Sequence, residues 1–193
     1  AAATAVPGAP IRAPAKPNGE TIRMTDTIRL YGLVTDSIVD GPGFRTSIFT
    51  QGCPHHCPGC HNPQTHDFEG GYVVDTDGLL EEMRQDPLLK GVTFSGGEPF
   101  CQPAPLAELA RKIHESGLDV TVYTGYTYEQ LLEQHNPDTD ALLQQADVLI
   151  DGRYEQDKRD LTLHFRGSSN QRVIDMNRTR AEGRVVVEQL DEE

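Results

Sequence analysis

The sequence predicts an α/β fold, an open partial (β/α) barrel in which helices cover a mainly parallel sheet. Between residues 91 and 151, short apolar runs alternate with amphipathic segments, which is the pattern of parallel strands joined by crossover helices. The chain has 193 residues, whereas a complete eight-stranded barrel takes roughly 250. The chain is therefore long enough for a partial barrel only.

The beginning of the chain differs in composition from the rest. Residues 1–23 are rich in alanine and proline and have almost no bulky apolar side chain, so we expect a flexible tail. Residues 24–193 are then expected to form a single folded domain. Two short β-prone runs, 28–34 and 46–50, flank a Gly-Pro-Gly turn signal in 40–45 and predict two strands.

The remaining elements follow from hydrophobic spacing. Four segments are predicted to be helical, the last either continuing or following the third, and these are residues 76–85, 104–117, 127–134 and 141–146. Three apolar runs between them predict buried strands, and these are residues 91–95, 119–124 and 147–150. Thr127 and Gln130 have the spacing of a capping box, and Gly117 suits the end of a helix. In such folds the chemistry lies at the carboxyl ends of the strands.

Charge and composition exclude several classes of protein. The formal net charge is -13, so the field of the protein repels phosphate backbones and anionic membrane surfaces, and we expect neither nucleic acid nor membrane as a partner. No run approaches the roughly 20 apolar residues of a spanning helix. Four cysteines, three of them crowded together, do not resemble a secreted disulfide framework. We therefore expect reduced thiols that bind metal in a cytoplasmic protein.

Three of the four cysteines share one short loop, "QGCPHHCPGCHNPQ", with the spacing C-x3-C-x2-C. They are Cys53, Cys57 and Cys60. A [4Fe-4S] cube needs one ligand for each iron, so three thiolates leave one iron open to a group that is not protein. This is one reason for a motif to stop at three cysteines.

A structural zinc site is the alternative interpretation of the same loop. A neighbouring histidine, one of His55, His56 and His61, would complete a Cys3His set. At these positions we favour loop packing and hydrogen bonding for the histidines. Cys101 as a fourth cluster ligand would close the open iron, so we expect it to be an incidental thiol near the site.

A second motif, "SGGEP", stands where the strand predicted at 91–95 ends. Gly96 and Gly97 would let a ligand lie against bare backbone, and Glu98 offers a carboxylate to a cationic group. Two further segments also follow predicted strands. Residues 124–127, "TGYT", are interpreted either as a helix cap or as a ligand contact, and "DGRY" at 151–154 as a simple turn near the mouth.

Together these motifs carry a family resemblance. "CPHHCPGC" followed by "SGGEP" resembles the radical S-adenosylmethionine superfamily, and "DGPGFRTSIFTQGCPHHCPGCHNPQT" resembles its glycyl-radical-enzyme activases. "VYTGYTYEQLL" and "FRGSSNQR" are similar to the branch that acts on anaerobic ribonucleoside-triphosphate reductases. The likeness runs from about Thr27 to Asp175.

The resemblance implies a radical S-adenosylmethionine fold and a set of site residues. The cluster ligands would be the three loop cysteines, and the methionine end of S-adenosylmethionine would lie at Gly96, Gly97 and Glu98. The adenosine would lie near three consecutive loop residues and a fourth from "TGYT", namely Gly59, Cys60, His61 and Thr124. The broader superfamily often has an aromatic residue where this chain has Gly59. For Phe165–Arg172 no role follows from physics.

The activity implied by the resemblance is the creation of a glycyl radical. Reductive cleavage of S-adenosylmethionine would be followed by hydrogen abstraction from a glycine of the large subunit of an anaerobic ribonucleotide reductase. A low-potential donor such as flavodoxin would supply the electron. The alternatives are another glycyl-radical partner, a small heterocycle as in the 7-carboxy-7-deazaguanine synthases, and a zinc-binding module without catalysis.

Overall fold

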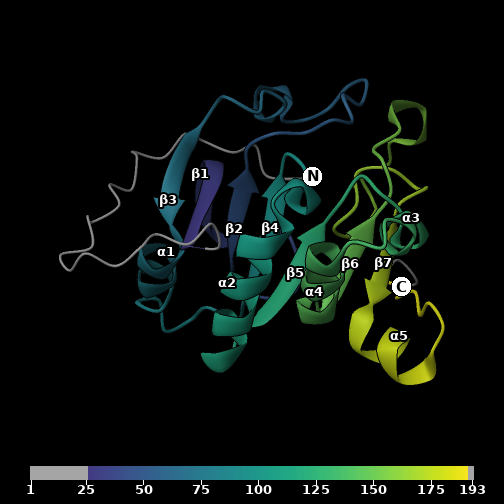
Figure 1. Cartoon of the computed structure of the whole chain (residues 1–193). Helices are drawn as coiled ribbons and strands as arrows, with labels where there is room; N and C mark the ends of the chain where they lie inside the picture. Colours follow the sequence, from purple (N-terminus) through teal and green to yellow (C-terminus); the bar gives the residue numbers. More distant parts are fainter. Residues whose placement is uncertain (1–25, 191–193) are drawn as a thin grey trace.

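A computed structural model describes residues 26–190 of the chain (Figure 1). These residues form one seven-stranded sheet in the order β3-β1-β2-β4-β5-β6-β7. The tail predicted at 1–23 lies outside the described residues. The division of the chain into a tail and a domain therefore stays a prediction.

The strands are β1 (Thr27–Ser37), β2 (Arg45–Thr50), β3 (Tyr72–Asp75), β4 (Gly91–Gly96), β5 (Asp119–Tyr123), β6 (Val148–Asp151) and β7 (Arg172–Asp175). The helices are α1 (Thr76–Met83), α2 (Pro103–Glu115), α3 (Tyr128–Glu133), α4 (Pro137–Gln145) and α5 (Met176–Glu182). Within residues 26–190, no helix is long and apolar enough to cross a membrane.

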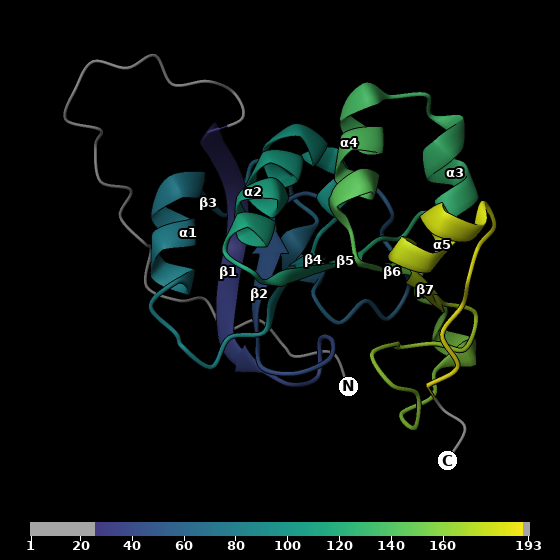
Figure 2. The same cartoon turned by 90° about the horizontal axis from the view of Figure 1, so that it is seen from below.

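The centre of the sheet is parallel, as the sequence predicts. β2, β4, β5 and β6 pair in parallel, whereas β1 runs antiparallel to β2 and β3, and β7 runs antiparallel to β6. The helices lie on one face of the sheet, and loops lie on the other (Figure 2). This arrangement confirms the predicted α/β class with an open, partial barrel. The carboxyl ends of the parallel strands meet at one edge.

The helix α2 provides much of the packing between helices and sheet. The four side chains predicted to share one face of this helix are all 0 % exposed, and they are Leu106, Leu109, Ala110 and Ile113. They pack in one cluster with apolar residues of β1, β2, β4 and β5. Gly117 follows the helix with a φ of +79°, a conformation that glycine adopts without strain.

The break between α3 and α4 settles the alternative left open by the sequence. Thr127 and Gln130 form the predicted capping box at the start of α3. A second helix begins at Pro137, and the Asn136 side chain accepts hydrogen bonds from the backbone N–H groups of Asp138 and Thr139. Because proline cannot continue a helix and Asn136 caps a new one, the two helices are separate.

Two described strands and one described α-helix lie outside the sequence prediction, namely β3, β7 and α5. β3 pairs with the first half of β1, and β7 adds an antiparallel strand beside β6. Asp175 caps α5 by accepting a hydrogen bond from the N–H of Arg178, and Gly183 ends the helix with a φ of +67°. The two strands form the outer edges of the sheet, on either side of its parallel centre.

On the face without helices, a buried arginine ties the first parallel strands together. Arg45 is 0 % exposed and donates to the hydroxyl of Thr93 at 2.8 Å and to the carbonyl of Val92 at 3.0 Å. Its guanidinium also pairs with Asp119 at 2.5 Å. These contacts join β2, β4 and β5 on the side opposite the helices.

The core contacts of α2 lead to a prediction on stability. Leu109→Ala should lower the free energy of unfolding by about 2–5 kcal/mol, because a fully buried side chain is removed and a cavity is left. Leu88→Ala is the matched control, since Leu88 is 65 % exposed and its loss should change stability by about 0.5 kcal/mol or less. Urea denaturation of both variants measures the difference. Equal midpoints would contradict this assignment of the core.

Candidate metal centre and cofactor site

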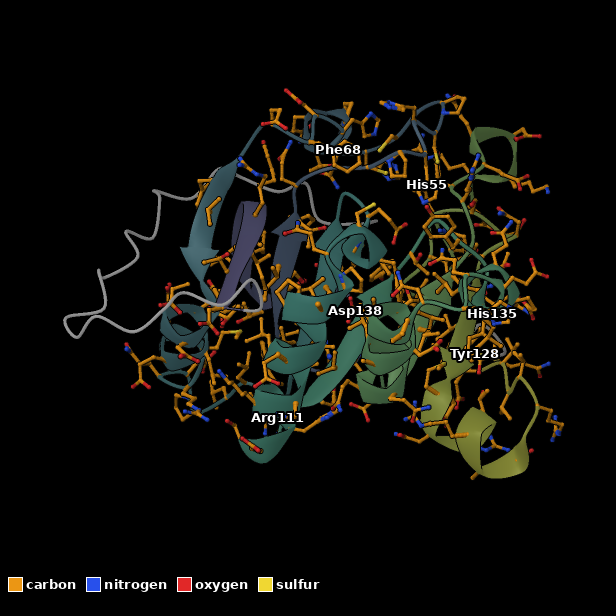
Figure 3. The ribbon with its side chains drawn as sticks, in the orientation of Figure 1. His55, Phe68, Arg111, Tyr128, His135 and Asp138 are labelled. Atoms are coloured by element: carbon orange, nitrogen blue, oxygen red, sulfur yellow. The ribbon has the colours of Figure 1, made fainter. Side chains whose placement is uncertain are left out.

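The cysteines lie in a loop that leaves the sheet at the carboxyl end of β2. We call residues 51–66 the cysteine loop. Its two ends are held together by backbone hydrogen bonds, from Gly52 N–H to the Thr65 carbonyl at 2.7 Å and from Cys53 N–H to the His66 carbonyl at 3.2 Å. His55, in this loop, and Phe68, just after it, lie at the same edge of the molecule (Figure 3).

The three predicted thiols surround one cavity. Cys53, Cys57 and Cys60 line it together with the glycine turn at the end of β4. All four cysteines of the chain are free, and Cys101 is exposed on the 3-10 turn that follows Glu98. Among residues 26–190, no group of three His, Cys, Asp or Glu side chains is arranged to hold a metal ion. The thiols are thus separate donors around a shared space.

The surroundings of two thiols suit a cationic inorganic group. The pKa of Cys53 is raised to about 11, mainly by burial and also by the charges of Glu98 and the other two thiols, although a backbone hydrogen bond from His55 lowers it. Burial and Cys60 also raise the pKa of Cys57, whereas a backbone hydrogen bond from Tyr154 and the charge of Arg153 lower it. A positively charged metal group would offset the desolvation and the mutual repulsion of these thiolates.

The glycine turn at the end of β4 packs directly against the end of β2. A Cβ at Gly96, whose φ is +92°, would lie 2.5 Å from the Thr50 nitrogen, and a Cβ at Gly97 would lie 2.4 Å from the Gly52 carbonyl oxygen. Backbone approach therefore requires glycine at both positions. The expected contact of this turn with the methionine end of a cofactor stays a prediction.

Glu98 directly follows the glycine turn, and its side chain is 0 % exposed. Its Oε1 accepts hydrogen bonds from the Phe100 N–H at 3.0 Å and the Thr124 hydroxyl at 2.9 Å. Its Oε2 accepts from the Gly125 N–H at 2.8 Å and contacts His55 Nε2 at 2.7 Å. The carboxylate is thus engaged by protein groups from three segments of the chain.

The "TGYT" segment contributes to the site through this carboxylate. Thr124 lines the cavity, donates its hydroxyl to Glu98 and accepts the N–H of Tyr126 at 3.1 Å. Thr127 is the N-cap of α3, so the helix-cap interpretation is confirmed for this threonine. The expected contact of Thr124 with the cofactor stays a prediction.

The last wall of the cavity comes from residues 152–171, which the sequence did not assign to the site. Tyr154 lies with its ring centroid 5.0 Å from that of His61. Gln171 braces the segment, because its Oε1 accepts the N–H groups of Gly167 and Ser168 and its Nε2 donates to the Gly152 carbonyl at 3.0 Å. "FRGSSNQR" therefore closes this wall. The position of "DGRY" directly after a strand was the available signal.

The local structure explains why position 59 is a glycine and position 151 an aspartate. Gly59 has a φ of +73°, and a Cβ there would lie 2.9 Å from the Gln156 side chain. Asp151 is 1 % exposed, accepts the Tyr128 N–H at 2.8 Å and pairs with Arg172 at 2.5 Å. The side chain of Asp151 thus fixes the segments around the cavity.

Comparison with known proteins decides the family. Residues 39–174 match the family model described as "4Fe-4S single cluster domain". The chain is 35% identical over 144 residues to the "Anaerobic ribonucleoside-triphosphate reductase-activating protein" of Escherichia coli (strain K12), which covers 70% of this chain and 91% of that protein. It is 39% identical over 145 residues to the protein of that name from Pasteurella multocida, covering 69% and 89%. The chain belongs to this family of activating proteins.

A relative that matches a shorter stretch of the chain has a related name. The "Pyruvate formate-lyase-activating enzyme" of Clostridium pasteurianum is 38% identical over 114 residues, 54% of this chain and 48% of that enzyme. Membership of the activating-protein family gives the cofactors, a single 4Fe-4S cluster and S-adenosylmethionine. The three thiols around one cavity, with no fourth among the lining residues, fit a cluster with one open iron.

The first prediction from this site concerns the thiols. Replacing Cys53, Cys57 or Cys60 singly by alanine should reduce the iron retained after anaerobic reconstitution to background, because each thiolate holds one iron. Cys101→Ala should retain about four irons per chain. Iron and sulfide analysis measures both results. A Cys101→Ala protein that alone loses its colour would contradict the ligand set.

The second prediction concerns the close contact of the glycine turn. Gly97→Ala would push the Gly52 carbonyl away and shift the adjoining Cys53, so both retained iron and S-adenosylmethionine affinity should fall severalfold. Gly117→Ala is the control, because Gly117 also has a positive φ but has no atom within 4 Å of its Cβ position. It should lose about 1 kcal/mol of stability and leave iron and affinity unchanged. Normal iron and affinity in Gly97→Ala would refute this account of the turn.

Proposed function

We propose that this protein activates an anaerobic ribonucleoside-triphosphate reductase by creating a glycyl radical on its large subunit. The observation that carries the proposal is the placement of three thiols around a cavity formed at the carboxyl ends of β2, β4, β5 and β6, in a chain of the activating-protein family. With the cofactors bound, one electron cleaves S-adenosylmethionine to methionine and a 5'-deoxyadenosyl radical, which takes a hydrogen atom from the glycine.

The residues of the chain bind and orient in this proposal. Cys53, Cys57 and Cys60 would hold three irons of the cluster, and the fourth iron would face the cavity. The carbonyl groups of the Gly96–Gly97 turn are the acceptors that we assign to the ammonium of the methionine moiety. The protein thus supplies placement and exclusion of water, while the cofactors supply the radical chemistry.

Additional residues around the cavity are assigned to the nucleoside. Gly59, Cys60, His61 and Thr124 would lie near the adenosine. Support comes from the cavity itself, since Cys60, His61 and Thr124 line it. The ring of Tyr154 beside His61 adds an aromatic surface to this end.

A protein substrate suits the open side of the fold. The helices cover one face of the sheet, and only loops lie on the other, which is the inside of the partial barrel (Figure 2). A glycine in a loop of a partner can approach there, and its lack of a side chain allows close access to the α-carbon. We further propose a low-potential donor such as flavodoxin for the electron, and a reducing compartment such as the cytoplasm for the four free thiols.

The test is the radical itself. A mixture of reconstituted protein, S-adenosylmethionine, strong reductant and the large reductase subunit should give a doublet electron paramagnetic resonance signal, because the unpaired electron couples to the one remaining α-hydrogen. The signal should elute with the large subunit in anaerobic gel filtration. Brief exposure to air should cleave the subunit at the radical glycine.

Another glycyl-radical partner is the second candidate, supported by the similarity to the pyruvate formate-lyase-activating enzyme. Replacing the reductase by such a partner in the same experiment compares the two directly. A protein that cleaves S-adenosylmethionine but never produces the doublet on the reductase would refute the proposed function. Acceleration of that cleavage by a small heterocycle would instead support a small-molecule enzyme.

A further inference from the structure

The hydrogen bonds of Glu98 leave its carboxylate without capacity for a ligand. An ionised carboxylate has about four lone-pair sites. Four protein groups occupy them at 2.7–3.0 Å, with Phe100 and Thr124 on Oε1 and Gly125 and His55 on Oε2. An ammonium group of a cofactor would have to displace one of these donors. The geometry therefore argues for a role of Glu98 other than direct contact with the cofactor.

His55 connects this carboxylate to the cysteine loop. Its side chain is 4 % exposed, and its ring packs edge-on against the ring of Tyr126 with centroids 4.5 Å apart. A Cβ at Gly125 would lie 2.4 Å from His55 Cδ2, so only glycine leaves room for the ring. In Figure 3, His55 lies where the cysteine loop approaches the segments that follow β5 and β6. The His55 ring is thus held in one position by Tyr126 and Gly125.

Glu98 and His55 adjoin different parts of the cofactor site. Glu98 adjoins the glycine turn, and His55 belongs to the cysteine loop. Glu98 directly follows the Gly96–Gly97 turn, and its N–H donates to the Gly52 carbonyl at 2.9 Å. His55 stands midway between Cys53 and Cys57 in the sequence. A shift of His55 against Glu98 therefore moves two cluster ligands relative to the turn.

We propose that Glu98 is a positioning residue, whose contact with His55 holds the cysteine loop against the ends of β4 and β5 and so sets the cluster relative to the methionine-binding turn. This inference rests on one part of the proposed function, the cleavage of S-adenosylmethionine. It does not depend on which partner protein receives the radical. Transfer of an electron to the sulfonium depends on close placement, so a displaced cluster lowers the cleavage rate more than the binding of S-adenosylmethionine.

Glu98→Gln tests the carboxylate. Each oxygen accepts one backbone N–H, so either orientation of the amide places its NH2 group against the N–H of Phe100 or of Gly125. In iron-replete protein we expect kcat for S-adenosylmethionine cleavage to fall at least tenfold and KM to change less than threefold. A tenfold rise in KM with a normal kcat would instead identify a direct ligand and overturn the proposal.

His55 provides a second, independent pair of variants. His55→Ala removes the donor and should reproduce the loss of kcat, whereas the amide nitrogen of His55→Gln can reach Glu98 and should restore most of it. The change that added S-adenosylmethionine causes in the electron paramagnetic resonance spectrum of the reduced cluster should be lost in His55→Ala and return in His55→Gln. Equal behaviour of the two variants would contradict the proposal.

Gly125→Ala probes the same contact from the other side. In the wild-type background it should displace the His55 ring and lower kcat at least tenfold. In the His55→Ala background the added methyl group meets no ring, so it should cause no more than a twofold additional loss. Additive losses would show that Gly125 acts independently of His55 and would overturn the proposal.

A matched control and the choice of assay keep the outcomes separate. Glu108→Gln makes the same chemical change at a partly exposed position of α2 and should leave kcat and KM unchanged. All of these measurements omit the partner protein. A failure of the glycyl-radical test with normal S-adenosylmethionine cleavage would therefore refute the proposed function and leave this inference intact.

Discussion

The parallel pairing of β2 with β4 is the constraint on which the site depends. Thr50 lies opposite Gly96 in the ladder, and the pairing continues beyond the strands as hydrogen bonds from Gly97 N–H to the Thr50 carbonyl and from Glu98 N–H to the Gly52 carbonyl. The cysteine loop and the glycine turn thus leave the sheet side by side. Because any side chain on the turn would collide with β2 backbone, the two motifs form one structural unit.

The parallel centre of the fold was predictable because its signals are local. Apolar runs, helical spacing and caps specify β4, α2, β5, α3 and β6 without reference to a distant partner. β3 and β7 each contain only two adjacent aliphatic residues, between a tyrosine or arginine and an aspartate, so neither shows a distinct apolar run. Their pairing with β1 and β6 is set by long-range contacts that no local pattern contains.

The candidate site likewise contains residues that a local sequence pattern identifies and residues that only the fold brings together. The three thiols were predictable, since their spacing within one loop is itself the signal. The partners of Glu98 were not, because His55 is 43 residues away and Gly125 is 27 residues away in the chain. From residue type alone, a carboxylate beside two glycines suggests a ligand for a cation. Only the fold reveals that protein donors already satisfy it.

The wall formed by residues 152–171 contacts the cysteine loop directly. The backbone N–H of Tyr154 interacts with the Cys57 thiol, and hydrogen bonds to sulfur help to set the reduction potential of an iron–sulfur cluster. A backbone donor does not depend on the side chain at its position, so the path of the chain has to be fixed instead. Gln171 fixes it by holding the Gly152 carbonyl and the N–H groups of Gly167 and Ser168. We therefore expect the "FRGSSNQR" segment to influence the surroundings of a bound cluster through the backbone at Tyr154, without contributing a ligand.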